Sequence, residues 1–140
     1  MPKQIYINLP VKDVAQSIAF YEALGFTKNP TFSDENASGM MWSDEIIVMI
    51  LKHEFYKKFI GNKTIADTSK TSSVLLALSL DSKEAVQKFA ETAKNNGGDY
   101  YKVDMGVPEE MMFGYEVQDP DGNQWEPVWM SPDFNPQSQQ

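Results

Sequence analysis

The sequence predicts an α+β fold made of two similar modules that pack together in one domain. The first observation is a strand-like run near the start of the chain that leads directly into a segment with helical spacing. The second is that this order recurs, with Phe89 standing 69 residues after Phe20 (89 − 20) and Asp81 standing 68 residues after Asp13 (81 − 13). The third is that three further strand-like runs follow each helix, so the pattern is β-α-β-β-β twice. Neither half could bury much core alone, so we expect one pseudo-symmetric domain.

The first module begins with a strand at residues 5–11, where apolar and polar side chains alternate with a period of two. A helix follows, because Asp13 stands three residues before Gln16 in the spacing of a capping box and Gly25 supplies a stop. Three more strands are predicted at residues 28–34, 39–43 and 46–51, with Asp44-Glu45 as a turn.

The second module repeats this order, beginning with an apolar strand at residues 74–80. Asp81 and Glu84 resemble a second capping box, and residues 95–98, which read Asn-Asn-Gly-Gly, end the helix. The remaining strands are predicted at residues 100–103, 113–118 and 124–129, with Pro120-Asp121-Gly122 as the turn before the last one.

The composition excludes several classes of site. The chain of 140 residues contains no cysteine, which excludes thiolate catalysis, iron–sulfur clusters and cysteine-ligated zinc. Its 20 acidic residues against 12 basic ones give a formal charge of −8, which disfavours nucleic acid as a partner. No apolar stretch approaches the roughly 18 residues of a membrane span, and the first residues lack the apolar run of a signal peptide. We therefore expect a soluble, cytoplasmic protein that binds neither membrane nor nucleic acid.

Two motifs resemble a known superfamily. They are LPVKD at residues 9–13 followed by SIAFYEALGF at residues 17–26, and DPDGNQWE at residues 119–126. Their content and order resemble the glyoxalase/bleomycin-resistance/extradiol-dioxygenase superfamily, also called vicinal oxygen chelate proteins, and more narrowly its small bacterial members labelled predicted lactoylglutathione lyase-like. The resemblance implies two cupped mixed sheets with helices on their outer faces, a site inside the cup, and a homodimer.

The same organisation predicts the domain boundaries. We expect a single domain at residues 1–132, made of a module at 1–60 and a module at 74–132 that are joined by a linker at 61–73. Residues 133–140 form a polar tail.

The resemblance also implies where a metal ion would bind, on the first and last strands of each module. The matching positions are Tyr6, Met49, Leu75 or its neighbour, and Glu126. A tyrosine with its high pKa, a thioether and an aliphatic side chain are poor ligands for a divalent ion, so only Glu126 is an ordinary ligand. Catalytic zinc has three protein ligands. The sequence therefore predicts no metal and no other cofactor, and a divalent ion would require ligands outside these positions.

Glu126 is the central candidate for function. It lies among aromatic residues in the last predicted strand, where a carboxylate could act as an acid or base with Tyr6, or could be held structurally by hydrogen bonds from a neighbouring strand. Alternation sends Trp125 and Trp129 to the opposite face of the strand. The residues expected to contact a ligand are Asn8, Met49, Leu75, Ala77, Phe113, Tyr115 and Gln124.

Two functions remain open at this point. The first is a metal-independent binder of a small organic molecule in the cup around Glu126, and the missing metal ligands favour it. The second is a divalent-metal-dependent lyase or isomerase of the glyoxalase type that uses Glu126, and a partner protein is a third alternative. His53, the single histidine, lies off the ligand pattern and is expected in a loop or at a helix start.

Overall fold

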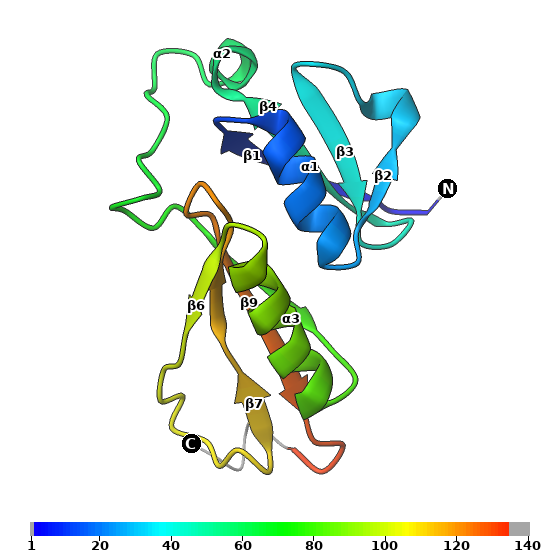
Figure 1. Cartoon of the computed structure of the whole chain (residues 1–140), viewed down its shortest axis with the longest axis vertical. Coiled ribbons are helices and arrows are strands. Elements are labelled where there is room, and N and C mark those ends of the chain that lie inside the picture. The colour runs from blue at the N-terminus through cyan, green and yellow to red at the C-terminus, as the bar shows by residue number, and fades with distance from the viewer. Residues whose placement is uncertain (1, 135–140) are drawn as a thin grey trace.

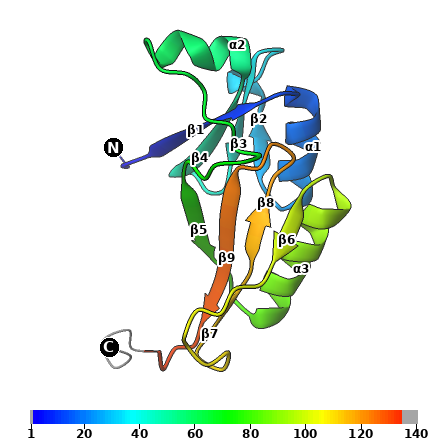
Figure 2. The ribbon, with the colours of Figure 1, turned by 90° about the vertical axis from the view of Figure 1, so that its left-hand side faces the viewer.

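The computed structural model describes residues 2–134 and has the predicted α+β fold (Figure 1). Two mixed sheets are present, and neither closes into a barrel. Both long helices lie on the same side of the sheets, which leaves the opposite sheet faces uncovered by them (Figure 2). Residues 135–140 of the predicted tail lie outside the described residues. Among the described residues, no helix combines the length and the apolar character that a membrane span requires.

The first sheet, here called sheet A, has the strand order β1-β4-β3-β2, with β1 parallel to β4 and the other neighbours antiparallel. The Asp13 side chain accepts a hydrogen bond from the Gln16 backbone N–H, which confirms the predicted N-cap. The strand predicted at 28–34 is shorter, because Pro30 begins a 3₁₀ turn that Asn29 caps. Its elements are β1 (Ile5–Val11), α1 (Val14–Ala23), β2 (Thr27–Asn29), η1 (Pro30–Phe32), β3 (Ala37–Met41) and β4 (Ile46–Lys52).

Two short helical elements follow sheet A, and the sequence analysis did not predict them as a pair. Helix α2 covers His53–Tyr56, and the 3₁₀ helix η2 covers Lys57–Phe59. His53 therefore lies at a helix start, which was one of its two expected positions. The linker after η2 has no regular secondary structure until residue 75.

The second sheet, sheet B, has the order β5-β9-β8-β6, with β7 paired to β9. Ser82 caps its helix by accepting a hydrogen bond from the Ala85 backbone N–H, so the predicted cap at Asp81 is wrong by one residue. The strand predicted at 113–118 is divided at Tyr115. The elements are β5 (Leu75–Ser79), α3 (Lys83–Asn95), β6 (Asp99–Tyr101), β7 (Met112–Gly114), β8 (Glu116–Gln118) and β9 (Gln124–Met130).

A shared core and a buried polar network join the modules. Phe20 of α1 and Phe89 of α3 belong to one cluster of buried apolar side chains. The buried Tyr21 hydroxyl donates a 2.8 Å hydrogen bond to the Asp119 carboxylate and accepts one from the indole N–H of Trp125 at 3.0 Å. These bonds connect α1 with the turn and strand at the end of sheet B, so the DPDGN segment fixes the two modules to each other.

Candidate functional site

The candidate site lies on the open face, which we define as the side of sheets A and B that faces away from α1 and α3 (Figure 2). Strand alternation separates the two sides. In β9, Trp125 is 4% exposed on the helix side, whereas Glu126 is half-buried on the other. Tyr6 and Leu75 on the open face are 45% and 57% exposed. Glu126 therefore faces the side on which the sequence analysis placed it.

The register of the sheets fixes which positions correspond between the modules. Asn8 of β1 pairs with Met49 of β4, and Ala77 of β5 pairs with Glu126 of β9. Asn8 and Ala77 differ by 69 residues (77 − 8), as do the two helix caps, Asp13 and Ser82 (82 − 13). The offset suggested by the two phenylalanines is thus confirmed over the offset of 68. Met49 and Glu126 are equivalent positions on the last strands.

Glu126 has a second carboxyl group beside it, and this is the principal feature that the sequence analysis missed. Strands β8 and β9 pair Val117 with Trp125, and the next pair in this register brings Glu116 opposite Glu126. Glu116 is only 7% exposed. Burial raises the pKa of Glu116 to about 7, and the negative charge of Glu126 and a hydrogen bond between the two carboxyl groups add to this effect. Both groups straddle Asp121 by five residues, so hairpin symmetry about the predicted turn was a usable signal.

Two polar side chains lie near this carboxyl pair. Gln124, one of the predicted ligand contacts, shares the open face with Glu126 because the two are separated by two positions in β9. Its side-chain N–H donates a weak 3.4 Å hydrogen bond to the Tyr101 hydroxyl. Within the described residues, its buried Oε1 has no hydrogen-bond partner. Gln124 thus has an unused acceptor on this side of the sheet.

The predicted residues of sheet A lie on the same face but are not joined to Glu126. The Tyr6 hydroxyl donates to the Gln4 side chain at 3.1 Å, and no hydrogen bond links it to Glu126 among the described residues. Asn8 is exposed and borders a cavity of about 290 Å³ beside α2. The pairing of Tyr6 with Glu126 as acid and base stays a prediction.

Leu75 and Ala77 border a separate cavity of about 320 Å³ at the seam between β1 and β5. Its other walls include the aromatic side chains of Phe26, Trp42 and Trp125. These two predicted contacts therefore adjoin both the open face and an aromatic cavity that extends toward the core.

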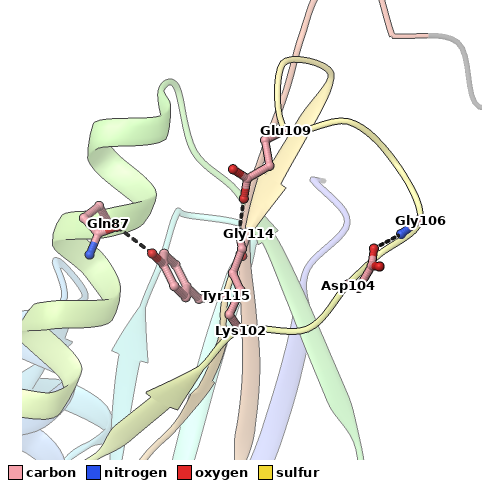
Figure 3. A network of polar contacts seen from close by, with 7 residues as sticks. All are labelled: Gln87, Lys102, Asp104, Gly106, Glu109, Gly114 and Tyr115. Atoms are coloured by element: carbon pink, nitrogen blue, oxygen red, sulfur yellow. Dashed lines mark hydrogen bonds and ion pairs between the residues drawn. The ribbon is translucent and has the colours of Figure 1, made fainter.

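Phe113 and Tyr115 lie on the opposite side of sheet B, toward α3. The Tyr115 hydroxyl donates a 2.7 Å hydrogen bond to Gln87 of α3 (Figure 3). The Lys102 ammonium lies 3.9 Å from the centre of the Phe113 ring and 4.7 Å from that of Tyr115. Strand alternation left the side of these two residues undecided, and their contacts separate them from Glu126.

The side chains of the open face do not fit a divalent metal ion. Tyr6, Asn8, Met49 and Ala77 offer no carboxylate or imidazole, and Glu116 adds one carboxyl group to that of Glu126. Within residues 2–134, no group of three or more histidine, aspartate and glutamate side chains is arranged to hold a metal ion. Two carboxyl groups fall short of the three ligands of catalytic zinc and of the six or more oxygens around calcium.

Comparisons with known proteins agree with this fold. A sequence model of the Glyoxalase/Bleomycin resistance protein/Dioxygenase superfamily matches residues 3–126. No curated protein sequence is similar enough to count as a match.

Among solved structures, hypothetical protein SA1046 from S. aureus is 22% identical with a TM-score of 0.73, over 92% of this chain and 95% of that one. A glyoxalase/bleomycin resistance protein/dioxygenase family enzyme from Burkholderia phytofirmans PsJN is 20% identical with a TM-score of 0.74, over 93% and 100%. A bleomycin-binding protein complexed with bleomycin is 20% identical with a TM-score of 0.60, over 93% and 100%. At these identities the likeness concerns the fold alone.

Proposed function

Because the chain belongs to the glyoxalase/bleomycin resistance protein/dioxygenase superfamily, we propose that it binds a small organic molecule on the open face around Glu126, without a metal ion. The observation that carries this proposal is the Glu116–Glu126 pair. A nearly buried carboxyl group beside a second one is costly to ionise, and here it lies on a sheet face that no helix covers. Such a pair is maintained at a cost to stability, which a ligand could offset.

The chemistry of the pair indicates the kind of ligand that it would accept. At pH values above 7 the two carboxylates repel each other, and an organic cation would relieve this repulsion by forming charge-assisted hydrogen bonds. The free acceptor of Gln124 could receive a further N–H or O–H group. Leu75 and Ala77 offer apolar surface for the rest of the molecule. The ligand we propose is an amine with an apolar or aromatic body.

A structural relative supports the general capacity of the fold. The bleomycin-binding protein holds a drug-like organic molecule on a scaffold of similar topology. Only the scaffold is transferred from this likeness, because sites are grafted on folds. Bleomycin therefore serves as one candidate ligand to be tested.

We also propose that two copies of the chain associate, as the family resemblance implies. Exposed apolar side chains on the open face, such as those of Tyr6, Leu75 and Met130, would lose contact with water in a dimer. Sedimentation-equilibrium measurements distinguish a monomer from a dimer, and a monomer at all protein concentrations would refute this part of the proposal.

The test compares a primary amine with its neutral analogue. Melting temperature is measured with 4-phenylbutylamine, with 4-phenylbutanol and with bleomycin, because a ligand that binds only the folded state raises apparent stability. We expect the amine to raise the melting temperature more than the alcohol, and Glu126→Gln to abolish the difference. Glu22→Gln on the exposed side of α1 removes the same charge and is the matched control.

The outcome also separates a functional Glu126 from a structural one. A structural role predicts that Glu126→Gln lowers stability and leaves ligand binding intact. If the variant responds to every probe as the wild type does, the site does not lie around Glu126.

The alternative is a metal-dependent lyase or isomerase of the glyoxalase type, with Glu116 and Glu126 as two of its ligands. Melting temperature with nickel, zinc, manganese, iron(II) and magnesium tests it by the same mass-action principle. A stoichiometric ion that is lost in Glu126→Gln would replace the metal-independent proposal by the alternative.

A further inference from the structure

A second cavity, distinct from the open-face site, has a different chemistry. Its volume is about 670 Å³, roughly twice that of the cavity beside Leu75, and lies within the range typical of small-molecule sites. It is enclosed by α2 and η2, by linker residues 61–69 and by Asp121 in the turn before β9. None of the residues assigned above to the Glu126 site borders it.

The cavity is locally basic in an acidic protein. Three ammonium groups from separate parts of the chain border it, those of Lys12, Lys57 and Lys63, together with the only imidazole of the protein, His53. Lys57 forms an ion pair with the exposed Glu54 at 3.3 Å. Lys12 and Lys63 have no ion pair among the described residues. The two lysines are therefore available to an anion.

The two carboxylates of the cavity are already engaged. Asp67 accepts hydrogen bonds from the backbone N–H and the hydroxyl of Ser69, and these bonds, with a smaller effect of the Lys12 charge, lower the pKa of Asp67. Asp121 accepts a 2.9 Å hydrogen bond from the Lys12 backbone N–H. Burial raises the pKa of Asp121, while the Lys12 N–H and the nearby His53 act against it. Three ammonium groups against two carboxylates leave a surplus of one positive charge (3 − 2), and protonation of His53 would make it two.

The wall formed by the linker is held in place. The Thr68 hydroxyl donates a hydrogen bond of 2.5 Å to the backbone carbonyl of Asp121, which joins the linker to the turn of sheet B (Figure 2). The Thr68 carbonyl lies where a Cβ atom on Gly122 would be, and Gly122 has a φ of +89°. The linker therefore packs against a turn that only glycine accommodates, and the cavity exists before any ligand arrives.

We propose that this cavity binds a small phosphate monoester, with its phosphate group held by Lys12, Lys63 and His53. A phosphate monoester carries a charge of about −1.5 to −2 at neutral pH, which matches the surplus positive charge once His53 is protonated. Lysine binds phosphate as a point charge, and an imidazole N–H donates a hydrogen bond to a phosphate oxygen. The chain contains no arginine, so the bidentate fork that favours planar carboxylates is absent from this cavity.

The experiment uses the single histidine as its reporter. The protein without a histidine tag gives one imidazole Cε1–H resonance in proton NMR, which is followed during titration with phenyl phosphate, inorganic phosphate and sodium chloride at constant pH. We expect a saturable shift with phenyl phosphate at concentrations below about 10 mM and a weaker one with inorganic phosphate. Chloride at matched ionic strength is expected to give no saturable shift.

Variants identify the groups that bind. The double variant Lys12→Gln/Lys63→Gln is expected to weaken phenyl phosphate binding by about tenfold or more, because two charge-assisted contacts are lost. Lys28→Gln/Lys88→Gln removes two exposed lysines outside the cavity and should bind as the wild type does. Equal weakening in both variants, an unchanged affinity in the first, or no saturable shift in the wild type would each overturn the proposal. The unchanged dispersion of the remaining spectrum checks that the variants are folded.

Discussion

Replacing Glu116 by Gln should stabilise the protein at alkaline pH. Glu116 is 7% exposed and its pKa is raised from 4.5 to about 7, chiefly by burial and then by Glu126. A carboxyl group with a raised folded-state pKa contributes stability below its unfolded pKa and loses it as the pH rises through its folded pKa. The difference of 2.5 pKa units (7 − 4.5) corresponds to a ceiling of about 3 kcal/mol, since one unit is worth about 1.4 kcal/mol.

The expected result is a difference that depends on pH. Because Glu126 is only half-buried, solvent screens part of the repulsion, and we expect Glu116→Gln to gain about 1–3 kcal/mol at pH 8. At pH 4.5 the carboxyl group is protonated in the folded protein, and the variant should be close to the wild type. The raised pKa values of Asp119 and Asp121 also make stability depend on pH, but they are common to both proteins and cancel in the difference.

Urea denaturation at several pH values between 4.5 and 8 measures this difference directly. Glu91→Gln, which changes an exposed carboxylate on α3, serves as the control and should show little dependence on pH. A Glu116→Gln variant that is less stable than the wild type at pH 8, or a difference that is constant over the range, would refute the reasoning.

Three further predictions concern the scaffold, and the free energy of unfolding measured in urea checks each of them. Ser82→Ala should cost about 1 kcal/mol through loss of the helix cap, whereas Asp81→Ala should cost much less, and the reverse order would restore the original cap assignment. Gly122→Ala should destabilise by more than about 2 kcal/mol, because the new methyl group would meet the Thr68 carbonyl at a positive φ. Tyr21→Phe should cost about 1–3 kcal/mol, because it leaves a buried carboxylate and a buried indole N–H each without one partner, and a neutral result would contradict the assigned network.

The elements that pack one face into the core were predictable from sequence. Strand β1 was predicted with the bounds that it has, and Asp13 was identified as a helix cap, because alternation and capping are local properties of the chain. The repeat of about 69 residues was also visible, since Phe20 and Phe89 are held at equivalent positions by the same core. The sequence therefore determined the topology of each module.

Elements without a buried face gave no such signal. Helix α2 has four residues and none of them is buried, so no apolar periodicity marks it. The division of the strand at Tyr115 depends on tertiary contacts, namely the bond of its hydroxyl to Gln87 and the 3.3 Å bond of its N–H to the Pro127 carbonyl. A pattern of residue types does not encode such contacts.

The candidate site was predictable in part for the same reason. Alternation placed Glu126 opposite Trp125 correctly, because only one side of β9 faces the core. The same rule could not place Phe113 and Tyr115, since both sides of β7 and β8 carry apolar residues. The burial of Glu116 depends on how the neighbouring strands cover it, so its partnership with Glu126 could be located from the hairpin but its raised pKa could not.

The two modules have diverged on one side only, and this is why the open face bears on function. On the helix side, Phe20 and Phe89 remain the same residue because each must fill the shared core. On the open face, Met49 corresponds to Glu126, so one sheet carries a thioether where the other carries a carboxylate. Packing cannot explain this difference, because the open face is not part of the core. A requirement that acts on the surface of sheet B alone would explain it, and a ligand that contacts Glu126 is such a requirement.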